Sequence, residues 1–218
     1  MSKTETASSK APKETSEDLS AAVAALKRGD VIIFPTETLY GLGADALDGA
    51  AVEKVFQLKG RDPRNPIPVL VADQEMLQTL VAEIPTTAQK LMERYWPGPL
   101  TLVLPGRKSI PKRLSNPTGG VGVRISSQPI ATVLIKELGR PLTATSANPS
   151  GKEPARTLQE AKAYFASQVE LFVDGGTLTS ATGSTVVEAM EDNIKIIRQG
   201  EISASELRQV LGEEKVLE

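Results

Sequence analysis

Patterns typical of helices and of strands alternate along almost the whole chain, and this alternation limits the fold more than any other feature. Apolar residues recur with helical spacing over 19–26, between a Ser16 N-cap and a Gly29 stop, and the apolar run 31–34 then predicts a strand. Further strands are predicted at 68–72, 100–104, 121–125, 142–145, 169–173, 184–188 and 194–198, and further helices at 52–59, 74–81, 88–95, 130–138 and 158–165. The capping-box spacing of Ser203 and Glu206 predicts a last helix.

A chain that alternates in this way is expected to form an α/β protein with helices packed on a sheet. The strands after Val169 follow one another closely, which favours some antiparallel pairing and therefore a mixed sheet. The segment 35–46 is interpreted as a loop.

The chain has 218 residues, which suits one larger α/β domain and leaves little room for two. Residues 1–18 are rich in Ser, Thr, Lys and Glu and have almost no large apolar group, so we expect a disordered tail. Residues 19–218 are expected to form a single catalytic domain, because neither an internal repeat nor a second boundary is visible in the sequence.

The complete absence of Cys and His excludes several kinds of site. Disulfides, thiolate nucleophiles and a Ser-His-Asp triad cannot form, and the usual zinc ligands are missing. No apolar run reaches the roughly 18 residues of a membrane span, and the N-terminus lacks the apolar core of a secretory signal, so we expect a cytoplasmic protein. The net charge of -2 gives no general attraction to nucleic acid, and an anion site must be local.

Two polar loops follow predicted elements, which is where open α/β sheets bind ligands. The run Pro35-Thr36-Glu37-Thr38-Leu39-Tyr40-Gly41-Leu42-Gly43 has hydroxyls and glycines that suit a small polar ligand, although a plain turn would use the same residues. The loop 59–66 carries Lys59, Arg61 and Arg64, which suit a polyphosphate. A solvated charge run after a helix remains the alternative for it.

Other candidate residues lie in or beside strands. Arg124 interrupts an apolar strand, where a charge needs an anionic partner, either a ligand or a protein carboxylate. The segment 143–151 is dense in small hydrogen-bonding groups and could surround a phosphate or form a turn. Ser184 follows Gly183 at the start of a strand, and Arg198 ends the next strand. No P-loop or complete dinucleotide fingerprint is present.

Taken in order, these segments resemble the YrdC/YwlC-like L-threonylcarbamoyladenylate synthase family, from Leu19 to about Glu201. The resemblance depends on five motifs, which are Pro35-Thr-Glu-Thr-Leu-Tyr-Gly-Leu-Gly43, Lys59-x-Arg61, Trp96-Pro-Gly-Pro-Leu-Thr101, Ser146-x-Asn148 and Ile197-Arg-Gln-Gly200. It implies a YrdC-like open fold with a twisted mixed sheet around a basic concave cavity. The chain resembles the short members, which lack an extra C-terminal domain.

The resemblance also implies an activity. Family members make threonylcarbamoyl-AMP and pyrophosphate from L-threonine, bicarbonate or CO2, and ATP, for threonylcarbamoyladenosine modification of tRNA. Mg²⁺ is expected to bind mainly through the nucleotide, with no metal ligands from protein side chains. The implied partners are the proteins that transfer the threonylcarbamoyl group to tRNA, and tRNA or double-stranded RNA itself.

Residue roles are carried over by motif. Contacts with ATP are implied for Lys59, Arg61, Asn65, Ser146, Asn148 and Arg198, with Lys59 and Arg61 as the catalytic cations, and contacts with L-threonine for Thr38, Arg124 and Ser184. Many members have a histidine at the position of Leu70, so one threonine contact is missing or replaced here. With no protein nucleophile, positioning and cations are expected to supply catalysis.

Two other functions stay open on the sequence. A basic concave surface could serve as an RNA-binding module without chemistry. A paralogue could use the same nucleotide pocket with another acyl substrate, and Leu70 favours this alternative.

Overall fold

The computed structural model describes residues 16–218, and seven helices and eleven strands cover most of this range. The helical N-cap and stop signals of the sequence are largely confirmed. Asp73 caps its helix through Met76 N, and both predicted capping boxes, Thr157 with Glu160 and Ser203 with Glu206, are formed. The α-helices are α1 (Ser16–Lys27), α2 (Gly49–Lys59), α3 (Gln74–Leu80), α4 (Thr86–Tyr95), α5 (Pro129–Leu138), α6 (Leu158–Phe165) and α7 (Ala204–Leu211).

The strands form two mixed sheets. One has four strands in the order β7-β2-β1-β8, and the other has seven in the order β11-β10-β9-β4-β5-β3-β6. Their bounds are β1 (Ile32–Pro35), β2 (Tyr40–Gly43), β3 (Val69–Leu70), β4 (Leu100–Pro105), β5 (Gly120–Arg124), β6 (Leu142–Thr143), β7 (Thr145–Ser146), β8 (Leu171–Phe172), β9 (Thr185–Ala189), β10 (Ile194–Arg198) and β11 (Val216–Leu217). Short 3-10 helices span Lys112–Leu114 and Glu213–Lys215.

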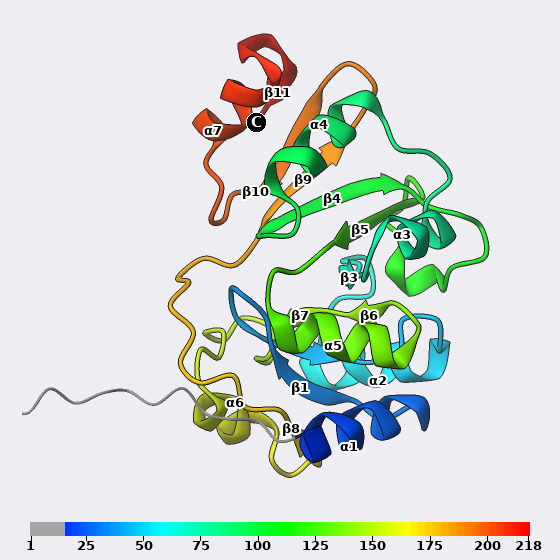
Figure 1. Ribbon diagram of the computed structural model, residues 1–218, viewed down its shortest axis with the longest axis vertical. Coiled ribbons are helices and arrows are strands. Elements are labelled where there is room, and N and C mark those ends of the chain that lie inside the picture. The colour runs from blue at the N-terminus through cyan, green and yellow to red at the C-terminus, as the bar shows by residue number, and fades with distance from the viewer. Residues whose placement is uncertain (1–15) are drawn as a thin grey trace, which may run out of the picture.

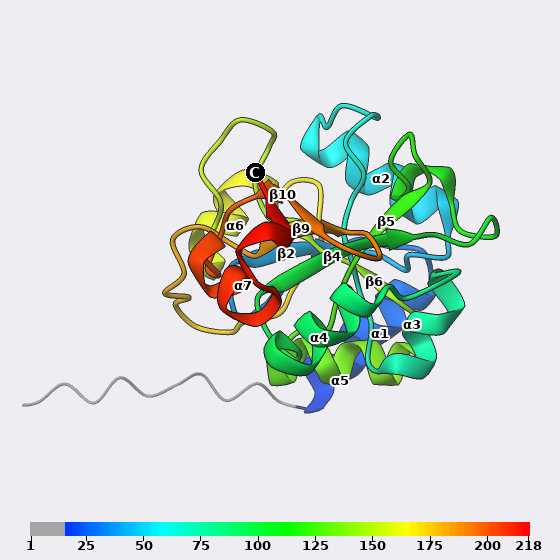
Figure 2. The same ribbon diagram turned by 90° about the horizontal axis from the view of Figure 1, so that it is seen from above.

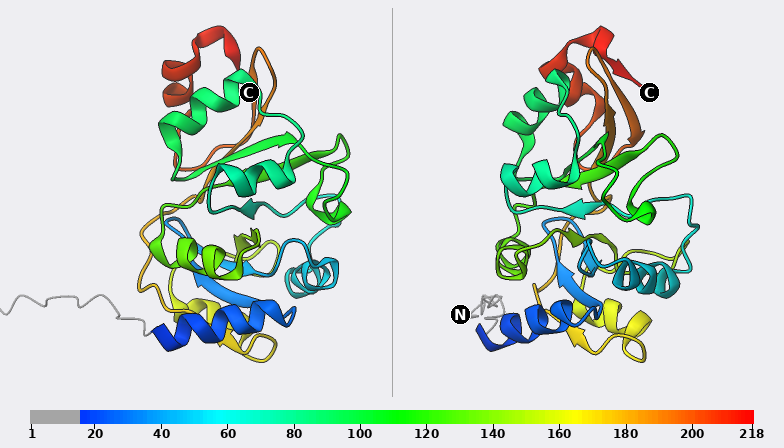
Figure 3. Two further views of the ribbon diagram at one scale, coloured as in Figure 1. Left: turned by 45° about the vertical axis from the view of Figure 1, so that its right-hand side comes forward. Right: turned by 90° about the vertical axis from the view of Figure 1, so that its right-hand side faces the viewer.

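The pairing confirms the expected mixed character. Strands β9 and β10 pair antiparallel, as their close spacing predicted, whereas β4 and β9 pair parallel. Strands β4, β5, β9 and β10 of the larger sheet lie in the upper part of the molecule in Figure 1, and β1 lies below them. Viewed from above, α1, α3, α4 and α5 lie on one side of β4 and β5, and α2 lies on the other (Figure 2). Both views in Figure 3 place α7 at the end of the molecule opposite α1.

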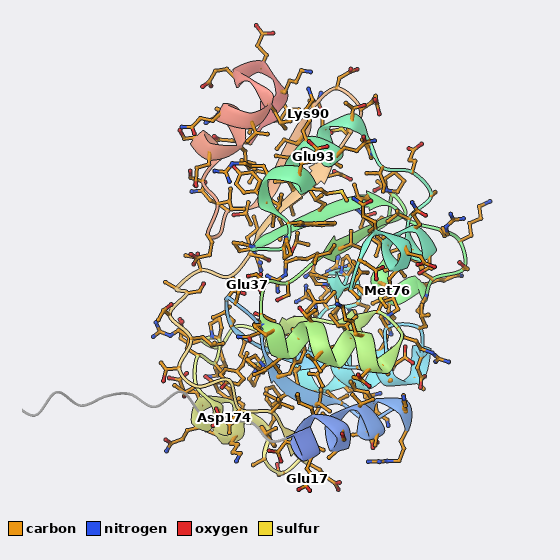
Figure 4. All side chains as sticks on the ribbon, viewed as in Figure 1. Glu17, Glu37, Met76, Lys90, Glu93 and Asp174 are labelled. Atoms are coloured by element: carbon orange, nitrogen blue, oxygen red, sulfur yellow. The ribbon has the colours of Figure 1, made fainter. Side chains whose placement is uncertain are left out.

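Two clusters of buried apolar side chains hold these layers together. The larger joins α2, α3, α4, α6 and α7 to both sheets, and the smaller joins α1 and α5 to β1, β3 and β6. Met76 packs against both clusters. It is labelled in Figure 4, beside α3. Met76 therefore links the two apolar clusters.

The segment 35–46 differs from its interpretation as a loop, because Tyr40–Gly43 is strand β2 and pairs antiparallel with β1. Thr36 Oγ1 accepts hydrogen bonds from Thr38 N and Leu39 N and so closes the turn between the strands. The two glycines hid this strand in the sequence. A Cβ at Gly43 would lie 2.7 Å from Cε1 of Phe34, so glycine permits this close approach.

The predicted strand 142–145 also differs, because it divides between the two sheets. Leu142–Thr143 pairs with β3 as β6, and Thr145–Ser146 pairs with β2 as β7. This short crossing brings the Ser146 motif next to the β1–β2 turn. The sheets consequently meet where the candidate residues lie.

Helix α1 begins at Ser16, so residues 16–18 belong to the helix and not to the tail assigned from the sequence, and Ser16 is not its cap. The rest of the predicted tail lies outside the described residues. Within residues 16–218, no helix is both long enough and apolar enough to span a membrane.

Candidate active site

A cavity of about 370 Å³ opens between the two sheets. Seven of the nine residues singled out from the sequence line it, namely Thr38, Arg61, Asn65, Arg124, Ser146, Ser184 and Arg198. They come from segments up to 160 positions apart. Its size is within the range of small-molecule pockets, and three guanidinium groups give it a strong preference for anions.

Arg61 is held in place by its own loop. Its Nε donates to Asn65 O at 2.7 Å and its Nη2 donates to Pro66 O at 3.1 Å. Burial, and then the charge of Arg198, lower the pKa of Arg61 from its usual value. A cation that is desolvated and repelled by a second cation gains most from an anionic ligand.

Arg198 ends strand β10 and contacts Ser184, which directly precedes the neighbouring strand β9. Its Nη2 donates to Ser184 O at 2.7 Å and lies 3.2 Å from Ser184 Oγ. Burial and the neighbouring charge of Arg124 lower the pKa of Arg198. The three arginines thus repel one another in series, and a polyphosphate or carboxylate between them would relieve that repulsion.

Arg124 is buried at the end of β5 and meets a protein carboxylate. Its Nη1 lies 3.4 Å from Oε1 of Glu37, and neither atom has a hydrogen bond within the described structure. The other carboxylate oxygen of Glu37 accepts a short hydrogen bond from Ser126 Oγ. Figure 4 labels Glu37 at the tip of the β1–β2 turn. Burial lowers the pKa of Arg124, and the charge of Glu37 opposes this shift.

The hydroxyl groups predicted to hold a ligand are paired with other hydroxyls. Thr38 Oγ1 lies 3.0 Å from Thr36 Oγ1, and Ser184 Oγ lies 3.0 Å from Thr101 Oγ1. A hydroxyl can donate and accept at once, so these pairs leave capacity for a ligand. Ser146 lines the cavity from β7, opposite Gly41 in β2.

Lys59 and Asn148 differ from expectation, because neither lines the cavity. Lys59 is 3% exposed and points away into the 146–150 segment, where its Nζ donates to Ser146 O at 2.6 Å and to Asn148 O at 2.8 Å. Asn148 is also buried and donates to Pro149 O and Lys152 O. Both residues lie behind the cavity wall.

Leu70 is fully buried and lies outside the lining. It pairs with Arg124 in the β3–β5 ladder, yet its side chain belongs to the smaller apolar cluster with Ile32 and Phe34. Leucine has no polar atom to offer a ligand, and its side chain at this position faces the apolar interior.

Several lining residues received no role from the sequence, above all Asn116, Glu188 and Thr101, the last of which only ends a family motif. Glu188 is the sole acidic side chain among the described residues of the lining. The alternation of buried and half-buried residues in β9 puts Val186 and Glu188 on the same face. A mid-strand carboxylate in an alternating strand was the available signal, but it does not reveal which face meets a cavity.

Comparison with known proteins agrees with these features. The Sua5/YciO/YrdC family model, described as "Telomere recombination", matches residues 24–200. A protein of Pyrococcus abyssi named threonylcarbamoyl-AMP synthase is 39% identical over 191 residues, which are 88% of this chain and 56% of that protein. A Mycobacterium tuberculosis protein named putative threonylcarbamoyl-AMP synthase is 34% identical over 209 residues, with 96% of each chain covered.

Among solved structures, P. abyssi Sua5 complexed with L-threonine superimposes with a TM-score of 0.89 at 36% identity, covering 94% of this chain and 60% of that one. The chain therefore spans little more than half of the archaeal relative and nearly all of the mycobacterial one. The family match over most of the chain, the mixed two-sheet fold and the order of the motifs agree, and the chain belongs to the Sua5/YciO/YrdC family.

Proposed function

We propose that this chain is an L-threonylcarbamoyladenylate synthase, which forms threonylcarbamoyl-AMP and pyrophosphate from L-threonine, bicarbonate or CO2, and ATP. The observation that supports this most directly is the convergence of Arg61, Arg124 and Arg198 in one cavity with Thr38 and Ser184. The names of the relatives and the threonine complex of P. abyssi Sua5 point to the same reaction.

The cavity is divided between the substrates in this proposal. Arg61, Asn65, Ser146 and Arg198 hold the nucleotide, and Thr38, Arg124 and Ser184 hold L-threonine, whose carboxylate meets the guanidinium of Arg124. Arg61 is the cation proposed to face developing charge on the phosphates, because its hydrogen bonds to Asn65 O and Pro66 O hold its guanidinium in place.

The reaction then needs no protein nucleophile. The amine of L-threonine adds to CO2 and loses a proton to give a carbamate, or it displaces water from bicarbonate. A carbamate oxygen forms a bond to the α-phosphorus of ATP, and the bond to the pyrophosphate leaving group breaks. Orientation of the two substrates and stabilisation of phosphate charge supply the acceleration.

Mg²⁺ is proposed to accompany ATP. Residues 16–218 contain no group of three or more acidic side chains that could hold a metal ion. In the described cavity lining, Glu188 is the one carboxylate and has no second carboxylate beside it. The nucleotide phosphates would thus supply most of the ligands, and the metal would offset phosphate charge.

The cellular setting follows from the same proposal. The chain would act in the cytoplasm as one catalytic domain of residues 19–218, and would pass its product to proteins that modify tRNA, with tRNA or double-stranded RNA as a further partner. A paralogue with another acyl substrate is the second candidate. It is suggested by Leu70, which stands where many family members have a histidine and which packs in the apolar interior outside the cavity lining.

Pyrophosphate release tests the proposal. The purified chain should release pyrophosphate when ATP, L-threonine and bicarbonate are all present, and omission of any one should abolish it. Release that is independent of bicarbonate or L-threonine would exclude the proposed reaction. Stronger release with another amino acid would favour the paralogue, and salt-sensitive RNA binding without any release would favour an RNA-binding module.

A further inference from the structure

Lys59, the last residue of helix α2, contacts the 146–150 segment through both its side-chain ammonium and its main-chain carbonyl. Its Nζ lies 2.6 Å from Ser146 O, 2.8 Å from Asn148 O and 3.4 Å from Asn148 Oδ1. Its own carbonyl accepts a hydrogen bond from Ser150 N at 2.8 Å. One residue thereby fixes both sides of the turn that follows β7.

The three oxygen partners of Lys59 Nζ use all three of its N–H donors, so none remains for a ligand. A lysine ammonium has three N–H donors and no acceptor, and three oxygen atoms of the 146–148 segment surround Nζ. The side chain is 3% exposed and does not reach the cavity lining. Lys59 therefore has neither a free proton nor a path to the phosphates.

The geometry points to Lys59 as a positioning residue, whose protonated ammonium sets the place of Ser146 in the cavity wall and does not itself contact substrate. The amide of Ala147 donates to Tyr40 O at 2.7 Å, and Ser146 pairs with Gly41, so the other side of the segment is fixed by β2. Lys59 supplies the restraint from the α2 side. The inference rests on the proposed function for the experiments that measure ATP binding, whereas the hydrogen-exchange experiments test it independently.

Protonation is required for this role. A neutral amine has two N–H groups and a lone pair, so one of the three oxygens would face a lone pair instead of a donor. Arg61 is the charged group that acts on Lys59, and no carboxylate pairs with Nζ in the part of the chain that is described. Burial, and then the charge of Arg61, lower the pKa of Lys59 from 10.5 to about 7.

Two effects of pH have opposite signs and can be separated. Between about pH 7 and 10.5 the unfolded chain holds more protons at this residue than the folded chain does, so the contribution of Lys59 to global stability rises with pH. The restraint on Ser146–Ser150 weakens over the same range. If the 146–150 segment loosens as the pH rises while global stability does not fall, the loss of the Lys59 proton acts locally on this segment.

The first experiment compares Lys59→Met with Lys54→Met, a control on the same helix whose side chain is half exposed. Hydrogen exchange is expected to rise in Lys59→Met at the amides of Ala147 and Ser150 and to stay unchanged in the control. Equilibrium binding of ATP is expected to weaken about tenfold, a difference of about 1.4 kcal/mol, with a much smaller effect on L-threonine. Weaker ATP binding without faster exchange would overturn the inference and favour direct contact.

The second experiment varies pH and uses the ratio of the ATP affinities of the wild type and of Lys59→Met, so that titration of the phosphates cancels. The ratio should be about tenfold at pH 6 and approach one by pH 9. A constant ratio would contradict the role of the proton.

If Lys59→Met fails to fold, hydrogen exchange of the wild type over the same pH range decides the matter. Protection of Ala147 and Ser150, corrected for intrinsic exchange, should fall above pH 7 while that of the β4–β5 ladder persists. If the wild type binds no ATP, the proposed function fails, and the exchange measurements still test Lys59.

Discussion

Glu37 Oε1 lies 3.4 Å from Arg124 Nη1, and both atoms are buried without a hydrogen bond to any residue of the described range 16–218. The pair neutralises a charge that strand β5 carries into the protein, at a residue that also lines the cavity. A carboxylate ligand of Arg124 would therefore meet a guanidinium that is already paired with Glu37.

This relationship predicts strong coupling between the two residues. Arg124→Gln should lower the free energy of unfolding by about 3 kcal/mol, because it leaves a buried carboxylate without its partner. The double variant Glu37→Gln with Arg124→Gln should lose less than the sum of the two single losses. Urea denaturation of the four proteins measures the coupling, and additive losses would show that the two charges do not depend on each other.

Arg61→Ala should reduce kcat/KM for ATP by about a hundredfold or more, since it removes a rigid cation from the phosphate end of the cavity. Unfolding should stay cooperative, because the hydrogen bonds of Arg61 among the described residues are to two carbonyls of its own loop. Arg64→Ala is the matched control, since Arg64 lies on the same loop and pairs with Asp62 in solvent. Loss of folding in Arg61→Ala would instead assign it a structural role.

Leu70→His should destabilise the protein by about 1–3 kcal/mol, because the imidazole would enter an apolar cluster without a partner for its polar atoms. Leu70→Met keeps the volume and should cost less. Chemical denaturation at pH 7 compares them. If Leu70→His leaves stability unchanged and strengthens L-threonine binding, the side chain at this position turns toward the ligand.

Gly43→Ala should cost about 1–3 kcal/mol, because its Cβ would lie 2.7 Å from the ring of Phe34 and the β1–β2 hairpin must shift. Gly49→Ala is the control, since a Cβ there meets nothing within 4 Å at the start of α2, and it should be neutral or stabilising. Thermal unfolding of both variants checks the contrast.

Local patterns predicted most of the secondary structure. The strand 194–198 was expected with the observed bounds, and the two capping boxes form as the spacing of Thr157 and Ser203 indicated. These features depend on residues within one or two turns of each other. Strand β2 was missed because its two glycines are required by Phe34 in a neighbouring strand, which local spacing does not reveal.

The order of the elements, the family motifs and the need for a local anion site could be predicted from the chain alone, because periodicity, caps and motif order are properties of nearby residues. Which motif residues face that site depends on long-range packing. Arg61 lines the cavity while Lys59, two positions earlier, turns behind its wall to the carbonyls of Ser146 and Asn148. That choice depends on the crossing of 142–146 between two sheets, a pairing between distant segments that neither segment specifies alone.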